Sequence, residues 1–383
     1  MVEPSRVQAG LLGAALAALM GLACDDVPGG AIEECSAGQV IPGAAATDIL
    51  FVIDDSWSMS EEQSTLRDGL SAFIQTLATS PVANDFQIGV TTTSVVDFGA
   101  TDDGTSGGVL VPPRIMTASD PDLVTKFQAA VLVGTSGASR EQPFTAARRA
   151  LEKSVPGGAN EGFLRPGAKL AVIFLSDEDD CSGTEPLLDD RACQSERTAS
   201  PSRLVPVQDV VSALSAGGTR ELVAAAITGV APGSLDLVCV TAPVCGGGPS
   251  VSCPTCCTTA FYPGYRFVEL LRSVGPASSR LASICDATFD QALRDFATVI
   301  LSQTLPLDGA PADWRLLVAY VERPGTSTTP CRIAPADADA ATRGAADAIY
   351  EPPAGGAPAS LTFQNACALE PGDRVVVDVV CAG

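Results

Sequence analysis

Apolar residues gather in short, continuous runs along the first two thirds of the chain. Ile49 to Ile53, Leu170 to Leu175 and Leu222 to Ile227 are uninterrupted, and Phe86 to Val90 is a fourth candidate. Runs of this length without polar alternation are typical of strands that are covered on both faces, as in a parallel sheet. We therefore expect a central, mostly parallel sheet.

Between these runs the apolar residues return at helical spacing. After Ser60, expected as an N-cap with Gln63 three residues later, the pattern predicts a helix with one apolar face. The apolar positions of this helix and of two later ones are Leu66, Leu70, Phe73, Ile74 and Leu77; Leu204, Val207, Val210, Val211 and Leu214; and Phe289, Leu293, Phe296 and Ile300. Strands that alternate with helices indicate an α/β fold.

The pattern changes past Leu305. The segment from Leu307 to Pro311 is rich in turn residues, and the stretches after it predict strands without helices between them. These stretches are Arg315 to Val321, Leu361 to Phe363 and Val375 to Val380. We expect residues 312–383 to form a small β module that follows the α/β part.

The N-terminal residues indicate export. Arg6 precedes an apolar run from Leu11 to Ala23. This run is shorter than the ~20 residues of a membrane-spanning helix, but it suits the apolar region of a secretory signal. Residues 1–23 are therefore predicted to be a signal peptide, and the mature chain is expected outside the cytoplasm.

The sequence from Gly21 to Cys24 resembles the lipobox of bacterial lipoproteins, whose Cys becomes the acylated first residue. Gly21 stands where that motif usually has Leu. The same residues also fit ordinary signal-peptidase cleavage, which would leave a periplasmic or secreted protein. The lipobox resemblance implies lipidation at Cys24, attachment to a membrane of the bacterial cell envelope or to the cell surface, and a solvated tether over residues 24–45.

The cysteine count fits an oxidising compartment. If Cys24 carries lipid, twelve of the 13 cysteines remain, enough for six disulfides. They are Cys35, Cys181, Cys193, Cys239, Cys245, Cys253, Cys256, Cys257, Cys285, Cys331, Cys367 and Cys381. The dense segment at about 239–257 could instead hold zinc, but we favour disulfides because C-x-x-C alone is a weak signal and the chain has no His. We expect this segment to be a disulfide-tied insertion at the rim of the sheet edge where the carboxyl ends of the strands meet, because open α/β sheets bind their ligands there.

Composition disfavours several classes of function. The chain contains no His, so it lacks Ser-His-Asp and Cys-His nucleophile activation and the commonest general base at neutral pH. Its formal net charge of −22 repels nucleic acid and attracts divalent cations. We therefore expect a binding protein rather than an enzyme, without a nucleic-acid partner.

The first apolar run leads directly into a D-x-S-x-S motif formed by Asp54, Ser56 and Ser58. Such a loop lies at the carboxyl end of a parallel strand, where open α/β sheets place their ligands. Asp177, just after another apolar run, supplies a second acid. Oxygen ligands of this kind suit a hard cation such as Mg²⁺, Mn²⁺ or Ca²⁺. Because two of the three loop ligands are neutral hydroxyls, the ion could accept a carboxylate from a partner.

The stretch from Asp48 to Met59 resembles the opening of von Willebrand factor type A (vWA) domains, which carry a metal-ion-dependent adhesion site. In that family a D-x-S-x-S loop, a Thr from a following loop and an Asp after the fourth strand surround one divalent ion. Asp54, Ser56, Ser58 and Asp177 match these positions. The resemblance covers about residues 46–305. It implies a doubly wound sheet with helices on both faces, and an ion that bridges to the carboxylate of a protein or glycan ligand.

Two departures from the family pattern bear on this site. Trp57 stands where family members often carry Gly, so its side chain is expected on the ligand-binding surface. The expected Thr has two candidates, Thr135 and Ser139. The acidic run from Asp177 to Asp180 could hold a second Ca²⁺, although such runs are more often solvated loops. A vWA-fold scaffold with an empty metal site and a metal-assisted hydrolase remain as alternatives.

Overall fold

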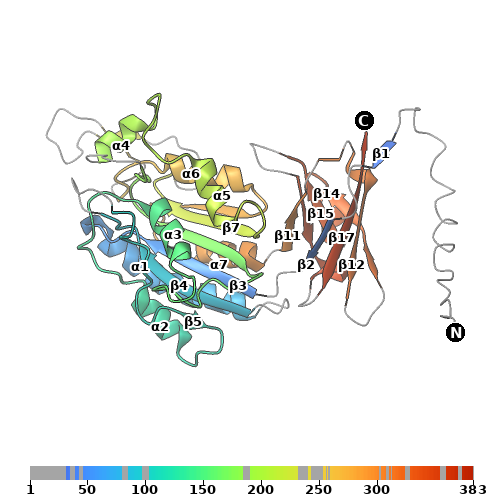
Figure 1. Ribbon diagram of the computed structural model, residues 1–383, viewed down its shortest axis with the longest axis horizontal. Coiled ribbons are helices and arrows are strands. Elements are labelled where there is room, and N and C mark those ends of the chain that lie inside the picture. Colours follow the sequence, from blue (N-terminus) through green and yellow to red (C-terminus); the bar gives the residue numbers. More distant parts are fainter. Residues whose placement is uncertain are drawn as a thin grey trace, which may run out of the picture.

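The computed structural model describes most of the chain. The described residues are 32–34, 39–42, 46–79, 85–96, 103–183, 190–231, 240–242, 253–255, 257, 259–301, 303–307, 310–311, 313–323, 328–353, 359–369 and 373–382. The predicted signal peptide and Cys24 lie outside them. Figure 1 shows an α/β part beside a smaller part made mainly of strands.

The α/β part is built on a six-stranded sheet. Its strands are β3 (Ala46–Ile53), β4 (Asp85–Thr92), β5 (Met116–Thr117), β6 (Lys169–Leu175), β7 (Leu222–Thr228) and β10 (Ser279–Ser283). They lie in the order β10-β7-β6-β3-β4-β5, and only the short edge strand β5 is antiparallel. The order reverses between β3 and β6, which makes this a doubly wound sheet.

Helices cover both faces of this sheet, as the alternating pattern predicted. One face carries α1 (Ser60–Ala78), α2 (Leu123–Ala130) and α7 (Asp290–Leu301), and the other carries α3 (Pro143–Glu152), α5 (Val207–Leu214) and α6 (Tyr265–Val274). A further helix, α4 (Asp190–Glu196), precedes α5. Because β3, β6 and β7 are covered on both sides, their residues are almost all buried.

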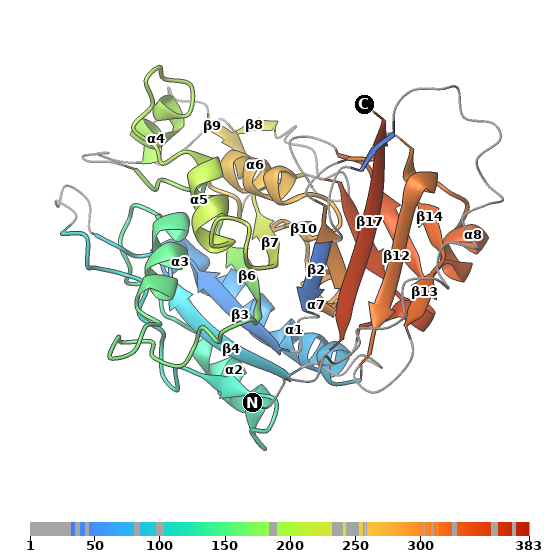
Figure 2. The same ribbon diagram turned by 45° about the vertical axis from the view of Figure 1, so that its right-hand side comes forward.

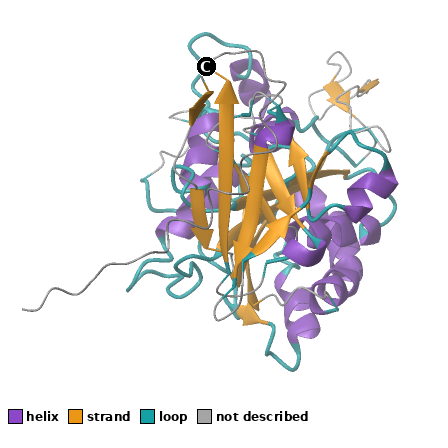
Figure 3. Cartoon of the chain, turned by 90° about the vertical axis from the view of Figure 1, so that its right-hand side faces the viewer, coloured by secondary structure: helices purple, strands orange, loops and turns teal. Residues whose placement is uncertain are grey.

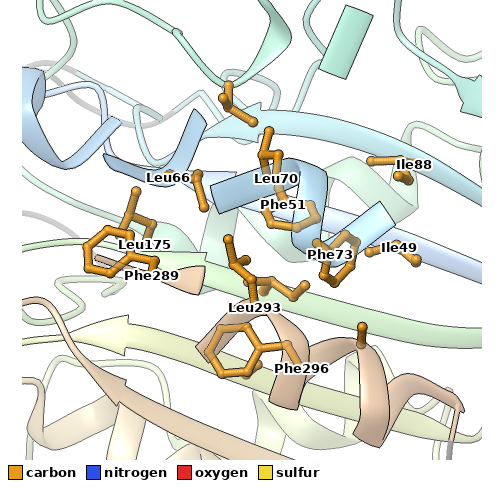
Figure 4. Packing of buried hydrophobic residues seen from close by; sticks show 14 of the residues in the cluster. Ile49, Phe51, Leu66, Leu70, Phe73, Ile88, Leu175, Phe289, Leu293 and Phe296 are labelled. Carbon is orange, nitrogen blue, oxygen red and sulfur yellow. The ribbon is translucent and has the colours of Figure 1, made fainter. Parts of the chain in front are cut away.

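The two cores divide the side chains of β3 by alternation. Ile49, Phe51 and Ile53 point to the face of α1 and α7, whereas Leu50 and Val52 pack on the opposite face. Figure 4 shows Phe51 against Phe73 of α1, and the ring centroids are 5.5 Å apart at an interplanar angle of 85°. This packing fixes the orientation of the strand that leads into the D-x-S-x-S loop.

The smaller part contains two antiparallel or mixed sheets around a common core (Figure 3). One has β1 (Ile32–Glu34), β2 (Gln39–Pro42), β12 (Leu317–Glu322), β13 (Thr329–Cys331) and β17 (Arg374–Ala382); the other has β11 (Gln303–Pro306), β14 (Ile333–Pro335), β15 (Ala348–Glu351) and β16 (Ser360–Phe363). The helix α8 (Ala340–Ala345) and the short helices η2 (Trp314–Leu316) and η3 (Asn365–Cys367) complete it.

The limits of this part differ from the predicted ones. Gln39–Pro42 and Ile32–Glu34 were expected within a solvated tether, but both pair with β17. Gln303–Pro306 was expected to end or follow the α/β part, and it pairs with β16. These strands are too short to show a period in the sequence, and they form because β16 and β17 offer unpaired backbone edges. Figure 2 shows β2 beside β17.

Three disulfides lie within the described residues. They join Cys181 to Cys193, Cys257 to Cys285 and Cys331 to Cys367. Because Cys257 is bonded to Cys285, its sulfur is not a free thiolate for the alternative zinc cluster. Around it, β8 (Val240–Ala242) and β9 (Cys253–Thr255) form a two-stranded sheet. The side chains of Cys35, Cys239, Cys245, Cys253, Cys256 and Cys381 lie outside the described residues.

No helix in the described ranges is long and apolar enough to cross a membrane.

Candidate functional site

The candidate site lies at the carboxyl ends of β3 and β6, the two neighbouring strands between which the sheet order reverses. Asp54 follows β3 directly, and its backbone N–H donates to the carbonyl of Leu175, the last residue of β6, over 2.9 Å. Asp177 comes two residues after Leu175. This reversal point is where doubly wound sheets bind their ligands.

The D-x-S-x-S loop directs its oxygens toward one place. The Ser56 backbone N–H donates to Oδ1 of Asp54 over 2.8 Å, and the Oγ atoms of Ser56 and Ser58 lie 3.0 Å apart. The hydroxyl of Ser176 donates to Oδ2 of Asp54 over 2.6 Å. Asp54 is fully buried, and burial raises its pKa to about 6 against the opposing hydrogen bond from Ser176.

Asp177 is the unusual member of the site. The residue is 1% exposed, and neither carboxylate oxygen accepts a hydrogen bond of ordinary geometry, although the Ser58 hydroxyl is close enough to lower its pKa. Burial is the main reason why its pKa rises to about 8, the charge of Asp54 adds to the rise, and the neighbouring Ser58 hydroxyl opposes it. A buried carboxylate without a partner costs free energy, so native proteins retain one where something else compensates it.

These four side chains fit a divalent cation. Two carboxylates and two hydroxyls are hard oxygen donors, and the two unpartnered oxygens of Asp177 supply the free lone pairs that an ion requires. Among the described residues, no three His, Cys, Asp or Glu side chains converge in a metal-binding cluster, so such a site depends on the serines.

Thr135 and Ser139 are placed differently from these four. Thr135 is half-buried and Ser139 is exposed, and no hydrogen bond joins either of them to the other four residues in the described structure. Their loop, residues 134–139, is nevertheless fixed at its backbone. Gly137 N–H donates to the Asp55 carbonyl over 2.8 Å, and Ala138 N–H donates to Ser94 Oγ over 2.7 Å.

Asp55, the residue that the motif skips, anchors this loop. Its Oδ1 accepts a hydrogen bond of 2.7 Å from the Ser94 hydroxyl. An added Cβ on Gly137 would lie only 2.3 Å from Cγ of Asp55, so the close approach requires glycine. Thr93 donates to Glu141, which is fully buried next to this network. These contacts could not be predicted from the sequence, because Thr93 and Ser94 follow β4, Gly137 and Glu141 lie before α3, and these residues share no local motif with Asp55.

Gln63 has a different role from the predicted one. Met59 occupies the N-cap position of α1 without a side-chain hydrogen bond, Ser60 is already helical, and the expected capping box does not form. The Gln63 amide instead donates to the carbonyls of Asp54 and Gly134, over 2.9 and 2.7 Å, and accepts from Gly134 N–H over 3.3 Å. The sequence could have indicated this role of Gln63, because an uncharged polar residue on the apolar face of a helix needs hydrogen-bond partners inside the protein.

The acidic run after Asp177 is neither solvated nor an open calcium site. Asp179 accepts a hydrogen bond from the backbone N–H of Arg266 over 2.9 Å, and Asp180 accepts one from Phe144 N–H over 3.0 Å. Asp180 also forms a 2.9 Å salt bridge with the Arg266 guanidinium. Both carboxylates therefore satisfy the first turns of α6 and α3, where negative charge is favoured.

An aromatic pair stands beside the site. Trp57 is 73% exposed, and its ring meets Phe261 edge to face at a centroid distance of 5.9 Å and an angle of 84°. The backbone N–H groups of Phe261 and Tyr262 donate to the Asp177 carbonyl over 2.7 and 3.0 Å. Trp57 and Asp177 are thus connected through Phe261, and the exposed position predicted for Trp57 agrees with this arrangement.

Comparisons with known proteins give only distant structural likenesses. No protein-family model matches the chain, and no curated protein is similar to it. Two structures of proximal thread matrix protein 1 from the mussel byssus are each 14% identical to it, with TM-scores of 0.36 and 0.35. They cover 70% and 71% of this chain, and 51% of each mussel chain is covered.

The open conformation of the pilus adhesin SpaC from Lactobacillus rhamnosus GG is 10% identical, with a TM-score of 0.38. It covers 88% of this chain, and 40% of the adhesin is covered. The chain therefore spans about half or less of these proteins, as their covered shares of 51% and 40% show. None of the three likenesses bears on the function of this chain.

Proposed function

We propose that this chain is an exported vWA protein that binds a protein or glycan ligand through a divalent cation and has no enzymatic activity. The cation is Mg²⁺, Mn²⁺ or Ca²⁺, and Asp54, Ser56, Ser58 and Asp177 hold it. Thr135 or Ser139 supplies a further oxygen. The ion accepts a carboxylate of the ligand at a position that the chain leaves open.

The observation that carries this proposal is the carboxylate of Asp177. It is buried without a hydrogen-bond partner, next to the D-x-S-x-S loop and at the reversal point of the sheet. A divalent ion would offset the cost of both buried acids, because an opposite charge within a few ångströms favours the ionised form. A scaffold with an empty site offers no such compensation.

The ligand-binding surface in this proposal includes Trp57. Its ring is exposed beside two of the proposed ion ligands and is supported by Phe261. Exposed tryptophans of this kind often contribute strongly to binding, because they bury a large area at a small entropic cost. A ligand that donates its carboxylate to the ion would also pack against this ring.

Export and lipid attachment complete the proposal. Three disulfides within the described residues suit an oxidising compartment. Cys24 would carry the lipid and hold the protein at a membrane of the cell envelope. Metabolic labelling with a radioactive fatty acid tests this part. We expect label in the wild-type chain and none in Cys24→Ser, and an unlabelled wild-type chain would contradict the anchor.

Calorimetric titration of Mg²⁺, Mn²⁺ and Ca²⁺ into the metal-stripped mature protein tests the ion site. We expect saturable binding to the wild type and none to Asp54→Ala. Asp68→Ala is the matched control, because Asp68 is an exposed acid on α1. Absence of binding to the wild type, or equal binding to Asp54→Ala, would overturn the proposed function.

A further inference from the structure

A third buried carboxylate stands near the proposed ion site. Glu62 lies in the first turn of α1, four residues after Ser58, and its side chain is only 5% exposed. Its Oε2 atom has no hydrogen-bond partner in the described structure. The preceding residue, Glu61, is exposed in the same helical turn. The two glutamates therefore differ in burial although they are neighbours in sequence.

The helix dipole does not explain why Glu62 is buried. Acidic side chains are favoured in the first turn of a helix, but they gain this benefit at the surface, as Glu61 does. Burying a carboxylate that leaves an oxygen unpartnered adds a desolvation cost. The backbone N–H groups of Glu61 and Glu62 lower the pKa of the Glu62 carboxyl, but they leave Oε2 unpartnered, so a nearby positive charge would stabilise Glu62 further.

Glu62 lies within electrostatic range of the two proposed ion ligands. Burial is the main cause that raises its pKa, and the charges of Glu61 and Asp54 add to the rise. Glu62 in turn contributes to the raised pKa of Asp177. Glu62 lies in the first turn of α1, four residues after Ser58, and its charge interacts with those of Asp54 and Asp177. Together the three buried carboxylates carry more negative charge than one divalent ion neutralises.

We infer that Glu62 sets the net charge of the ion site and thereby balances cation affinity against affinity for an acidic ligand. The inference rests on the proposed function. Because no three acidic side chains converge in a metal-binding cluster, Glu62 acts through space or through water and not as a direct ligand. If all three carboxylates are ionised, Asp54 and Asp177 neutralise the two charges of the bound cation. The charge of Glu62 then leaves the cation-bound site with a net charge of about −1.

The inference predicts two affinities that change in opposite directions. Removal of the Glu62 charge weakens attraction for the cation, and it also removes repulsion of a carboxylate that approaches the bound ion. Damage to the local structure would instead lower both affinities. Removal of one buried charge near the ion corresponds to an effect of about tenfold on cation binding.

Electron paramagnetic resonance of Mn²⁺ measures the first affinity, and water-proton relaxation of the Mn²⁺-loaded protein titrated with acetate measures the second. Glu62→Gln is the test variant and Glu61→Gln the matched control, since each removes one charge from the same turn. We expect Glu62→Gln to bind Mn²⁺ about tenfold more weakly and acetate severalfold more tightly. Glu61→Gln should change neither affinity by as much as twofold.

Each outcome bears on a definite claim. If Glu62→Gln binds Mn²⁺ and acetate as the wild type does, or loses both affinities together, the inference on Glu62 is wrong while the ion site stands. If the wild type binds no Mn²⁺, the proposed function itself fails. Glu62→Ala removes the same charge with a smaller side chain and should change both affinities in the same directions, so the test remains decisive if Glu62→Gln folds poorly.

Discussion

Acidic residues that are adjacent in sequence have different surroundings in this protein. Asp54 takes part in the proposed ion site, whereas Asp55 holds the 134–139 loop through Ser94. Asp177 is buried without a hydrogen-bond partner, and Asp180, three residues later, is fully engaged with Arg266 and α3. The sequence shows that both segments are acidic. Only the three-dimensional contacts show which carboxylates are free to bind an ion and which ones hold the structure together.

The unpartnered carboxylate of Asp177 predicts an unusual mutational effect. In the metal-free protein near pH 7, Asp177→Asn should raise the free energy of unfolding by about 1 kcal/mol, because folding raises the pKa of Asp177 to about 8 and so must protonate a group that is ionised in the unfolded chain. The same change should abolish divalent-ion binding. Urea denaturation with and without Mn²⁺ measures both effects. A destabilised metal-free variant would show that the Asp177 carboxylate has a structural partner.

Gly137 permits the close contact between the 134–139 loop and Asp55. Gly137→Ala should lower the free energy of unfolding by about 1–3 kcal/mol, because the new methyl group would overlap the Asp55 carboxylate. Chemical denaturation measures this change. Gly344→Ala is the control, since an added Cβ there meets no atom within 4 Å and α8 gains a better helix former. Equal stability of both variants would contradict the close packing.

At the scale of elements, Gln63 connects three segments that are distant in sequence. It lies in α1, and its amide joins the residue that follows β3 to the loop that begins at Gly134. We expect Gln63→Met, which keeps the side-chain length but removes the hydrogen bonds, to weaken Mn²⁺ binding about tenfold. Circular dichroism should show an intact fold. Unchanged Mn²⁺ affinity would mean that the loops hold their positions without Gln63.

A second element-scale prediction concerns the smaller part. The Arg332 guanidinium donates to Asp347 over 2.7 Å and holds the pKa of that buried carboxyl below its usual value. Stability from this pair is therefore present above about pH 4, the unfolded pKa, and is lost as the pH falls through the lower folded pKa.

Asp347→Asn should accordingly destabilise the protein by about 1–2 kcal/mol at pH 7. Near pH 2 the difference should disappear, because protonated Asp347 resembles asparagine in charge. Urea denaturation at the two pH values measures the change. If Asp347→Asn lowers the free energy of unfolding equally at both pH values, the charge of Asp347 does not stabilise the protein.

The elements of the α/β part were predictable because their signals are local. The uninterrupted runs at Ile49–Ile53, Leu170–Leu175 and Leu222–Ile227 became buried parallel strands, and their spacing along the chain indicated helices on both faces. The D-x-S-x-S loop and Asp177 were also visible, since each follows such a run. Gln63, Glu62 and the Ser94 contact were not, because burial of a polar side chain depends on elements far away in sequence.

At the scale of the whole molecule, the candidate site lies away from the N-terminal strands β1 and β2. The first two described strands, β1 and β2, pair with β17 of the smaller part. The strand β3 begins four residues after β2 ends. The amino end of β3 therefore lies near the smaller part, and Asp54 lies one strand length beyond it. Eight residues of strand span about 26 Å. The candidate site therefore lies at the end of the sheet that is distant from β1 and β2.

The net charge of −22 acts at this scale too. It raises the local concentration of divalent cations, and it repels a strongly acidic partner at long range. In the proposed function, a suitable ligand would therefore offer a single carboxylate on a surface that is neutral or basic. The long-range repulsion by the protein would then not oppose the attraction of that carboxylate to the proposed ion.

Anomalous diffraction from crystals grown with Mn²⁺ tests the central claim most directly. The proposed function predicts one strong anomalous peak that is coordinated by Asp54, Ser56, Ser58 and Asp177, with Mn²⁺–oxygen distances of about 2.2 Å. The peak should be absent from Asp54→Ala crystals grown in the same way. A wild-type map without a peak at these four residues, or with Mn²⁺ only elsewhere, would contradict a metal-dependent binding site.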